Sequence, residues 1–223
     1  METNLLETLW PIRDKEFGVP NPNPAVVHRH EARYRKAAGM ILEHSRIARR
    51  HAVWLDVACG TGYGADIIHR MAMPLFYLGV DANERVIEYA RKHFGAKDGL
   101  QDGSKTLFRV FSCLDAIDAL YAKGGERFDG IVSVETLEHL PQEHQQVFCD
   151  GVVSALRGAG AAVISCPVGS GEKPENPFHL YEPTPEDMYR YLGPNLKSLV
   201  FEDVLDGTYG GFTQMYALIR CRH

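Results

Sequence analysis

A glycine-rich turn at residues 60–64 is the feature whose residue types and spacing most directly suggest chemistry. Gly60, Gly62 and Gly64 occupy alternate positions just after an apolar run that ends at Val57. Because glycine has no Cβ, the backbone can turn sharply there and approach a ligand closely. The amides of a helix that begins after such a turn attract negative charge. The pattern predicts a ligand-binding loop between a strand and a helix.

An acid beside this turn narrows the choice of ligand. Dinucleotides favour glycines spaced G-x-G-x-x-G, whereas the spacing here is G-x-G-x-G and Asp56 lies inside the strand end. A pyrophosphate would gain nothing from that carboxylate. A zwitterionic amino acid would gain, because its ammonium needs an acceptor. The residues therefore favour S-adenosyl-L-methionine over NAD, and the competing interpretation is that the glycines only turn a chain corner.

A second acid, Asp81, closes the next apolar run, Tyr77–Val80. It follows the glycines by about 20 residues, the spacing at which a carboxylate can accept hydrogen bonds from both hydroxyls of a ribose. The competing interpretation is that Asp81 caps the helix after it.

Carboxylates and histidines form a third group of candidates. Glu135, Glu138 and His139 follow the fourth apolar run at spacings that place them on one face of a helical turn. Histidine is the natural general base near neutral pH, and His179 in the later loop 169–185 is a second candidate. The alternatives are a structural role for His139, or a divalent metal held by the carboxylates and the imidazole. The residues leave the metal undecided.

These motifs resemble those of one enzyme family. Residues 55–64 resemble motif I of class I S-adenosylmethionine-dependent methyltransferases, V-L-D-x-x-C-G-x-G. Residues 131–141 resemble the V-S-x-E-x-x-E-H-L segment of that family, and residues 30–34 and 176–186 resemble type-11 members that act on glycans and small molecules. Motif I is specific for the superfamily, and the other segments are moderately specific for a subgroup.

The resemblance implies transfer of a methyl group from S-adenosyl-L-methionine to a hydroxyl or amine of a small molecule, such as a sugar or sugar nucleotide. The enzyme must align the nucleophile with the sulfonium methyl and, for a hydroxyl, remove its proton. His139 and His179 are the catalytic candidates, and Phe178 and Tyr181 are expected to shape the acceptor site. The implied cofactor contacts are Tyr34, Asp56, Ala58, Gly60, Gly62, Asp81, Ala82, Cys113, Leu114, Asp115 and Glu135.

Within that set, residues 113–115 are expected to read the adenine. The resemblance assigns this task to the backbone of Cys113 and Leu114 and to the side chain of Asp115. Asp115 is an equally good N-cap for the short helix that follows it.

Alternating hydrophobic periods predict the elements that position these residues. Strands are expected at 53–57, 76–80, 107–111, 128–134 and 161–165, and helices at about 25–50, 65–73, 83–94, 117–122 and 142–156, the last stopped by Gly158 and Gly160. Strands at 200–205 and 213–219 have no helix between them and must run antiparallel. The prediction is an α/β, Rossmann-like class I methyltransferase fold. Its seven-stranded sheet is mostly parallel, with one antiparallel strand near the C-terminus and helices on both faces.

Composition limits the other classes of function. The 223 residues suit one domain at 25–223 after a proline-rich arm or lid at 1–24, with a formal net charge of −5 and no apolar run long enough to span a membrane. Five scattered cysteines without a Cys-x-x-Cys pair argue against a disulfide framework or a zinc knuckle. We expect a cytoplasmic protein with a small-molecule partner and no membrane partner. The residues do not select an oligomeric state.

Three alternative functions remain open. A nucleic-acid methyltransferase would use the basic residues of the first helix, which include His28, Arg29, Arg33, Arg35 and Lys36. The same residues are typical of the solvent-exposed face of a surface helix. No Asn-Pro-Pro-Tyr type signature follows the fourth strand, which argues against methylation of the amino groups of bases. The glycine spacing disfavours a NAD-dependent oxidoreductase. The intact glycines and acids disfavour a non-catalytic domain that only binds the cofactor or a partner.

Overall fold

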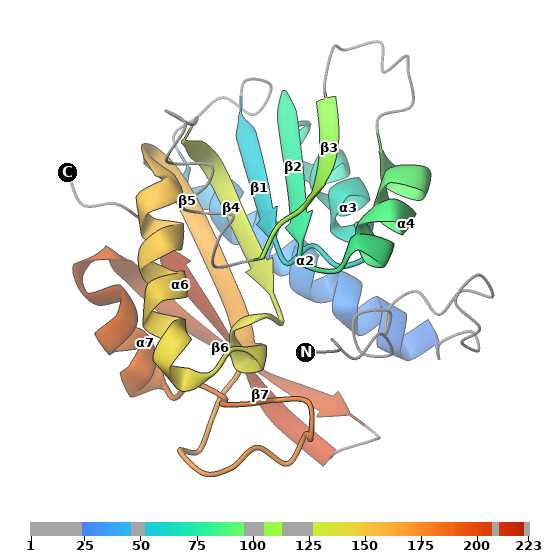
Figure 1. Cartoon of the computed structure of the whole chain (residues 1–223). Helices are drawn as coiled ribbons and strands as arrows, with labels where there is room; N and C mark the ends of the chain where they lie inside the picture. Colours follow the sequence, from blue (N-terminus) through green and yellow to red (C-terminus); the bar gives the residue numbers. More distant parts are fainter. Residues whose placement is uncertain (1–23, 46–51, 96–104, 113–126, 207–209, 221–223) are drawn as a thin grey trace.

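The computed structural model describes residues 24–45, 52–95, 105–112, 127–206 and 210–220. Seven strands form one sheet in the order β3-β2-β1-β4-β5-β7-β6 (Figure 1). β7 runs antiparallel to both β5 and β6, and every other neighbouring pair is parallel. The predicted sheet is thus confirmed. The strands are β1 Val53–Val57, β2 Phe76–Asp81, β3 Lys105–Val110, β4 Phe128–Val134, β5 Leu156–Pro167, β6 Leu196–Asp206 and β7 Gly210–Ile219.

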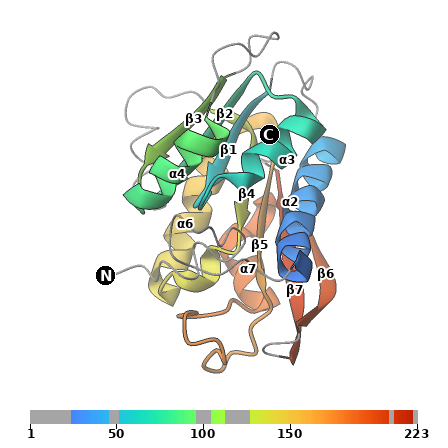
Figure 2. The same cartoon turned by 90° about the vertical axis from the view of Figure 1, so that its right-hand side faces the viewer.

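Helices cover both faces of the sheet, as expected. The α-helices are α2 Pro24–His44, α3 Tyr63–Ala72, α4 Glu84–Phe94, α6 Gln142–Ala155 and α7 Pro185–Leu192, and two 3-10 turns are η3 Leu137–His139 and η4 Gly193–Asn195. α2, α3 and α4 pack on one apolar cluster, and α6 and α7 pack on another. Figure 2 shows α2 and α6 on opposite sides of the central strands. Among the described helices, none is both long and apolar enough to cross a membrane.

The alternation of side chains along β1 explains the two cores. Leu55 and Val57 belong to the cluster under α6, whereas Trp54 belongs to the cluster under α2 and α3. All five residues of β1 are buried, as is usual for a central parallel strand covered on both faces. The carboxyl ends of β1, β2 and β4 therefore meet at one edge, where ligands bind in open α/β sheets.

Several predicted boundaries differ from the structure, and the largest differences are at the start of β5 and at the end of the first helix. Gly158 and Gly160 do not stop a helix before a loop, because β5 already begins at Leu156 and contains both. A Cβ built on Gly160 would lie 2.7 Å from the carbonyl oxygen of Asp129, so the missing side chain permits close approach to β4. The first helix ends at His44 instead of 50, and it includes Pro24, which the arm was expected to hold. Proline is tolerated in the first turn of a helix because its missing amide hydrogen has no helical partner there.

Several predictions fall outside the described residues. They are the arm before residue 24, the short helix at 117–122 and the expected adenine contacts Cys113, Leu114 and Asp115. They remain predictions.

Candidate functional site

The glycine loop joins β1 to α3 through three residues with left-handed backbone. Ala58 has φ 58°, Gly60 φ 53° and Gly62 φ 83°. At Gly62 a built Cβ would lie 2.7 Å from the Ala90 Cβ and 2.9 Å from the Phe108 Cε1. Glycine is therefore required here both by the backbone angle and by contact with α4 and β3. Ala58 adopts a similar angle with a side chain, at some cost in strain.

Asp56 lies beneath this loop and is completely buried. Its Oδ1 accepts a hydrogen bond from the Tyr34 hydroxyl at 3.2 Å, and its Oδ2 accepts one from the Tyr77 hydroxyl at 2.6 Å. Burial raises the pKa of Asp56 to about 7, although both tyrosine hydrogen bonds lower it. The carboxylate faces the tyrosines, so its burial does not support the expected direct contact with a ligand ammonium.

Tyr34 fastens α2 to the start of α3. A Cβ on Gly64 would lie 2.3 Å from the ring, and the Tyr34 ring meets Tyr63 edge-on with 5.1 Å between centroids. Only 2% of Tyr34 is exposed. The structure thus places this expected cofactor contact beside the loop, with its hydroxyl turned to Asp56.

Asp81, at the end of β2, is tied to the same loop. Its Oδ2 accepts from the Gly60 amide at 3.0 Å and its Oδ1 from the Asn83 amide at 2.9 Å. Burial raises its pKa, and the bonds from the backbone amides of Asn83 and Gly60 act in the opposite direction. Asn83 is the N-cap of α4 and accepts from the Arg85 amide, so the capping role considered for Asp81 was wrong. The side chain of Asp81 stays partly exposed, next to the exposed Ala82.

Glu135 follows β4 with φ 56°, an unusual angle for a residue with a side chain. Its Oε2 pairs with Arg33 Nη1 at 3.1 Å, and its Oε1 accepts from Gln214 Nε2 at 2.6 Å. Glu135 therefore links α2 to β7, which differs from the expected grouping of Glu135 with Glu138 and His139.

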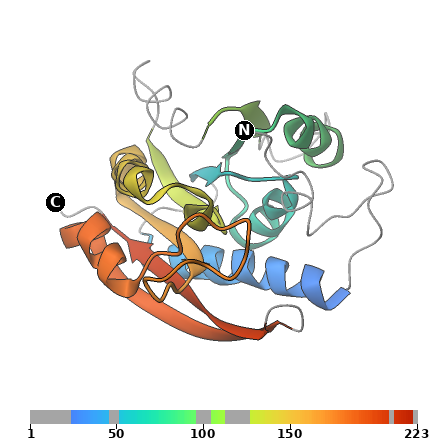
Figure 3. The ribbon, with the colours of Figure 1, turned by 60° about the horizontal axis from the view of Figure 1, so that its bottom comes forward.

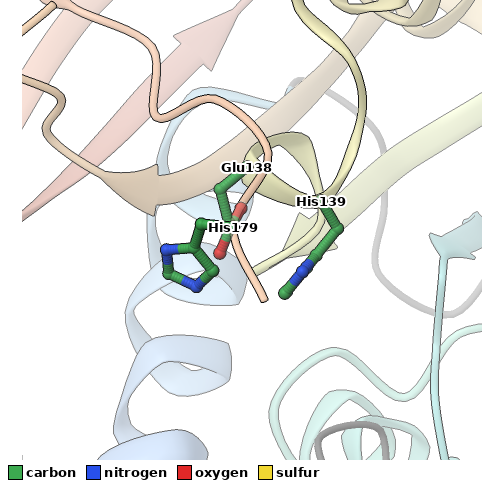
Figure 4. Close-up of side chains that lie close together, drawn as sticks. All are labelled: Glu138, His139 and His179. Carbon is green, nitrogen blue, oxygen red and sulfur yellow. The ribbon is translucent and has the colours of Figure 1, made fainter. Parts of the chain in front are cut away.

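The structure instead brings Glu138, His139 and His179 together (Figure 4). The first two lie in η3 and the third in the segment between β5 and α7, and one ligand atom from each lies within 4.8 Å of the others. Glu138 is completely buried, and neither carboxylate oxygen has a hydrogen-bond partner among the described residues. Burial and the charge of Glu135 hold the pKa of Glu138 well above its usual range. This carboxyl group needs a proton or a cation.

Hydrogen bonds orient both imidazoles. His139 Nδ1 lies 3.1 Å from the carbonyl oxygen of Phe178, which can only accept, so in the neutral ring Nδ1 carries the hydrogen and Nε2 a lone pair. His179 Nδ1 lies 2.5 Å from Glu182 Oε1, which makes Nδ1 the donor there too. Its Nε2 lies 2.9 Å from Asn176 Nδ2. His179 thus has partners at both nitrogens, whereas His139 presents a lone pair.

Gln145 holds the two segments together, and sequence reasoning missed it. This buried α6 side chain donates from Nε2 to the carbonyl of Tyr181 at 2.8 Å and to that of Leu137 at 2.8 Å. The amides of Leu180 and Tyr181 donate to the carbonyl of Glu138 at 2.8 and 3.3 Å. Figure 3 shows the β5–α7 segment passing beside η3. A glutamine in the apolar register of the helix, three residues before Phe148, was the available signal.

Cations of α2 that could have bound nucleic acid are engaged within the protein. Arg35 pairs with Glu31, Lys36 pairs with Glu202 on β6 at 2.8 Å, and Arg33 pairs with Glu135. These pairs favour the interpretation of α2 as a helix packed on the sheet with a wet outer face.

The fold and the glycine loop are those of class I methyltransferases, which confirms the resemblance. Residues 55–160, which hold the loop, Asp81 and the Glu138–His139 pair, match the family described as "Methyltransferase domain". The matched stretch of this 223-residue chain, residues 55–160, thus has the sequence pattern of a methyltransferase domain.

A curated relative is the ubiquinone biosynthesis O-methyltransferase of Nitrosospira multiformis, 28% identical over 103 residues. The alignment covers 46% of this chain and 38% of that protein, so the chain matches well under half of the relative's length.

Solved structures of low sequence identity share the fold. Magnesium protoporphyrin IX methyltransferase from Synechocystis PCC 6803 with bound SAM is 15% identical with a TM-score of 0.64, covering 92% of this chain and 88% of that one. The 1,6-didemethyltoxoflavin-N1-methyltransferase of Burkholderia thailandensis is 20% identical with a TM-score of 0.61, covering 87% and 81%. The N-methyltransferase NodS of Bradyrhizobium japonicum is 17% identical with a TM-score of 0.63, covering 90% and 98%.

Proposed function

We propose that this protein transfers the methyl group of S-adenosyl-L-methionine to a hydroxyl group of a small molecule, with His139 as the general base. The observation that carries the proposal is the 3.1 Å contact of His139 Nδ1 with the Phe178 carbonyl oxygen, which in the neutral ring leaves a lone pair on Nε2. It lies in the turn that follows β4, at the carboxyl edge of the sheet where the glycine loop also lies. Hydroxyl acceptors, sugars included, require such a base, whereas a neutral amine attacks with its own lone pair.

The residues around the glycine loop fit the proposed cofactor. The loop offers close backbone approach at Gly60 and Gly62, and the partly exposed Asp81 is aligned by the Gly60 amide. A carboxylate at the end of β2 can accept hydrogen bonds from both ribose hydroxyls of this cofactor. Asp56 would act indirectly, by holding Tyr34 and Tyr77 beneath the loop.

The reaction at this site is an in-line displacement. The acceptor oxygen attacks the methyl carbon while the carbon–sulfur bond breaks, and the bonding pair stays on sulfur, which becomes a neutral thioether. The hydroxyl proton passes to His139 Nε2. His179 meets the His139 ring edge-on with 5.0 Å between centroids and is itself held by Glu182, so it orients His139 and limits the space beside it. Alignment and proton removal are the main contributions of these residues.

A divalent metal at Glu138, His139 and His179 is a second candidate mechanism for the same reaction. Both imidazoles donate from Nδ1 to an oxygen, at Phe178 and Glu182, the arrangement that orients metal-ligating histidines. An ion would have to displace the Asn176 amide from His179 Nε2. The buried, unpartnered carboxylate of Glu138 supplies the negative charge that such an ion needs. A bound ion would polarise the acceptor hydroxyl and lower its pKa.

Calorimetry with S-adenosyl-L-methionine, S-adenosylhomocysteine and NAD tests the cofactor. We expect both sulfur ligands to bind and NAD not to bind; tight binding of NAD alone would end the proposal. Gly62→Val is the matched site variant, because a side chain there collides with Ala90 and Phe108. Gly171→Val is its control, since a Cβ at Gly171 meets nothing within 4 Å and the backbone angle is the same, φ 83°.

Dialysis against a chelator separates the two mechanisms. Full activity after metal removal leaves His139 as the base. Loss of activity that Mg²⁺, Mn²⁺ or Zn²⁺ restores in the wild type but not in Glu138→Gln assigns the role to the metal.

A further inference from the structure

Two apolar side chains flank His179 and are open to solvent. Phe178 is 38% exposed and Leu180 is 53% exposed. Single exposed apolar residues are ordinary on protein surfaces, so exposure alone decides nothing. Their position is informative, because the carbonyl of Phe178 orients His139 and the amide of Leu180 is bonded to Glu138.

The backbone under these side chains is held at successive positions. The Phe178 amide donates to Asn176 Oδ1 at 3.0 Å, and the Phe178 carbonyl accepts from His139 at 3.1 Å. The Leu180 amide donates to the Glu138 carbonyl at 2.8 Å. Neither side chain can withdraw into the protein by a backbone movement without breaking bonds that place the histidines. The backbone that carries the apolar pair is therefore fixed beside His139.

The charges nearby do not suit a phosphorylated acceptor. Glu182 lies against His179, and the exposed ionisable groups of the loop are Glu172, Lys173 and Glu175, which sum to a negative charge. Arg33, the buried cation of the neighbouring helix, already pairs with Glu135. A diphosphate would meet mostly carboxylates here, whereas a neutral molecule would not be repelled.

We propose that the acceptor is a hydroxyl compound with an apolar aryl or alkyl body and no phosphate, which packs on Phe178 and Leu180 while its hydroxyl lies at His139 Nε2. This inference rests on the proposed function for the role of His139. The expected acceptor is then an uncharged apolar molecule and not a sugar nucleotide. The apolar contact would anchor the molecule, and the orientation of the histidine would select the oxygen to be methylated.

A homologous series of 4-alkylphenols tests the apolar contact directly. The dissociation constants of 4-ethyl-, 4-butyl- and 4-hexylphenol are measured with and without S-adenosylhomocysteine, and UDP-glucose is measured beside them. Full burial tightens binding by about fourfold for each added methylene. We expect a steep chain-length dependence in the wild type and no saturable binding of UDP-glucose.

Three variants complete the test. Phe178→Ser and Leu180→Ser should each flatten the chain-length dependence, by roughly tenfold for the hexyl compound, and leave the affinity for S-adenosylhomocysteine unchanged. Phe201→Ser is the matched control, since Phe201 on β6 is 47% exposed outside the site. Circular dichroism and light scattering report folding and oligomeric state.

Each remaining outcome overturns the inference. These outcomes are an affinity independent of chain length, an equal loss in Phe201→Ser, tighter binding of UDP-glucose, or a change of oligomeric state in Phe178→Ser that assigns the surface to a second copy of the chain. Failure of S-adenosylhomocysteine to bind would instead overturn the proposed function, while the alkylphenol series without it still tests the apolar contact.

Discussion

At the carboxyl edge of the sheet, the polar side chains of the β1–β2 side and of the β4–β5 side differ in their hydrogen-bond partners. On the β1–β2 side, both oxygens of Asp56 and both of Asp81 accept hydrogen bonds from tyrosines or backbone amides. On the β4–β5 side, Glu138 is buried with no hydrogen-bond partner among the residues that the structure describes, and the neutral ring of His139 has a lone pair on Nε2. The Thr61 hydroxyl in the glycine loop is also buried without a partner among the described residues, but an unpaired buried carboxylate is far more costly than a hydroxyl. Glu138 therefore indicates where an acceptor molecule or an ion is expected. The β1–β2 side fixes the shape of the glycine loop, whereas the β4–β5 side offers groups that can react with a ligand.

The strongest test of this contrast is removal of the proposed base. His139→Ala should lower kcat by about 10²–10⁴-fold, the usual contribution of a general base, while the affinity for S-adenosyl-L-methionine stays within a factor of about two. Single-turnover methylation and calorimetry measure the two quantities. His179→Ala is the comparison variant, and its loss should be smaller because His179 acts by orienting His139. Equal and full activity in both variants would remove general-base catalysis from this site.

The buried Asp56 on the β1–β2 side should make the free energy of unfolding depend on pH. The folded-state pKa of Asp56 is raised from 3.8 to about 7, so the folded protein keeps a proton that the unfolded chain releases. The contribution of Asp56 is fully present below pH 3.8 and is lost as pH rises through about 7, a change of about 4 kcal/mol. Asp56→Asn should therefore flatten the decline of the free energy of unfolding over this interval.

Urea unfolding of both proteins at a series of pH values gives the difference curve. Asp66→Asn, at an exposed acid of α3 paired with Arg70, is the control and should run parallel to the wild type. If Asp56→Asn also runs parallel, the buried carboxylate is ionised throughout and the contrast between the halves is weaker than inferred.

The link between η3 and the β5–α7 segment should depend on Gln145. Gln145→Leu removes the donor shared by the Leu137 and Tyr181 carbonyls, and each carbonyl left unpaired costs about 1–3 kcal/mol of stability. Because the segments carry His139 and His179, kcat should fall more than the cofactor affinity. The control is Gln146→Leu on the next position of α6, whose side chain bonds Asp150 and the Tyr191 carbonyl, away from the histidines. A purely structural role would lower stability and leave kcat unchanged in the folded protein.

The cofactor half was also the more predictable from sequence. Strand periodicity and glycine spacing are local signals: β1 has the bounds that its apolar run predicted, and β2 ends one residue later than predicted. The burial of Asp56 was not predictable in this way, because its partners Tyr34 and Tyr77 are 22 and 21 residues away in the chain. The sequence marks a strand-end acid without showing which side of the loop it faces.

The acceptor half depends on contacts that no local pattern encodes. His139 and His179 meet because the β5–α7 segment folds back over η3, and the imidazole of His139 and the carbonyl that orients it are 39 positions apart in the chain. Helical spacing predicted that Glu135 lies beside Glu138. The positive φ of Glu135 and its bonds with Arg33 and Gln214 instead direct its side chain toward α2 and β7. The start of α7 was encoded locally, since Thr184, Pro185 and Asp187 form a capping box with proline in the first turn.

Asp81 gives the most sensitive test of the difference between the two sides. Both of its oxygens already accept hydrogen bonds, yet the cofactor is still expected to contact it. Asp81→Asn keeps the shape but turns an amide group toward the Gly60 or the Asn83 amide and removes the charge-assisted acceptor. The affinity for S-adenosyl-L-methionine should weaken by about tenfold, the scale of one lost hydrogen bond to a charged group. Asn83→Ala is the matched control, since it removes the cap of α4 and should lower stability by about 1 kcal/mol without changing the affinity. Calorimetry and urea unfolding of both variants separate the outcomes. If the affinity for S-adenosyl-L-methionine falls in proportion to the loss of stability in both Asp81→Asn and Asn83→Ala, Asp81 only supports the glycine loop. If the affinity is unchanged in Asp81→Asn, the carboxylate does not belong to the cofactor site.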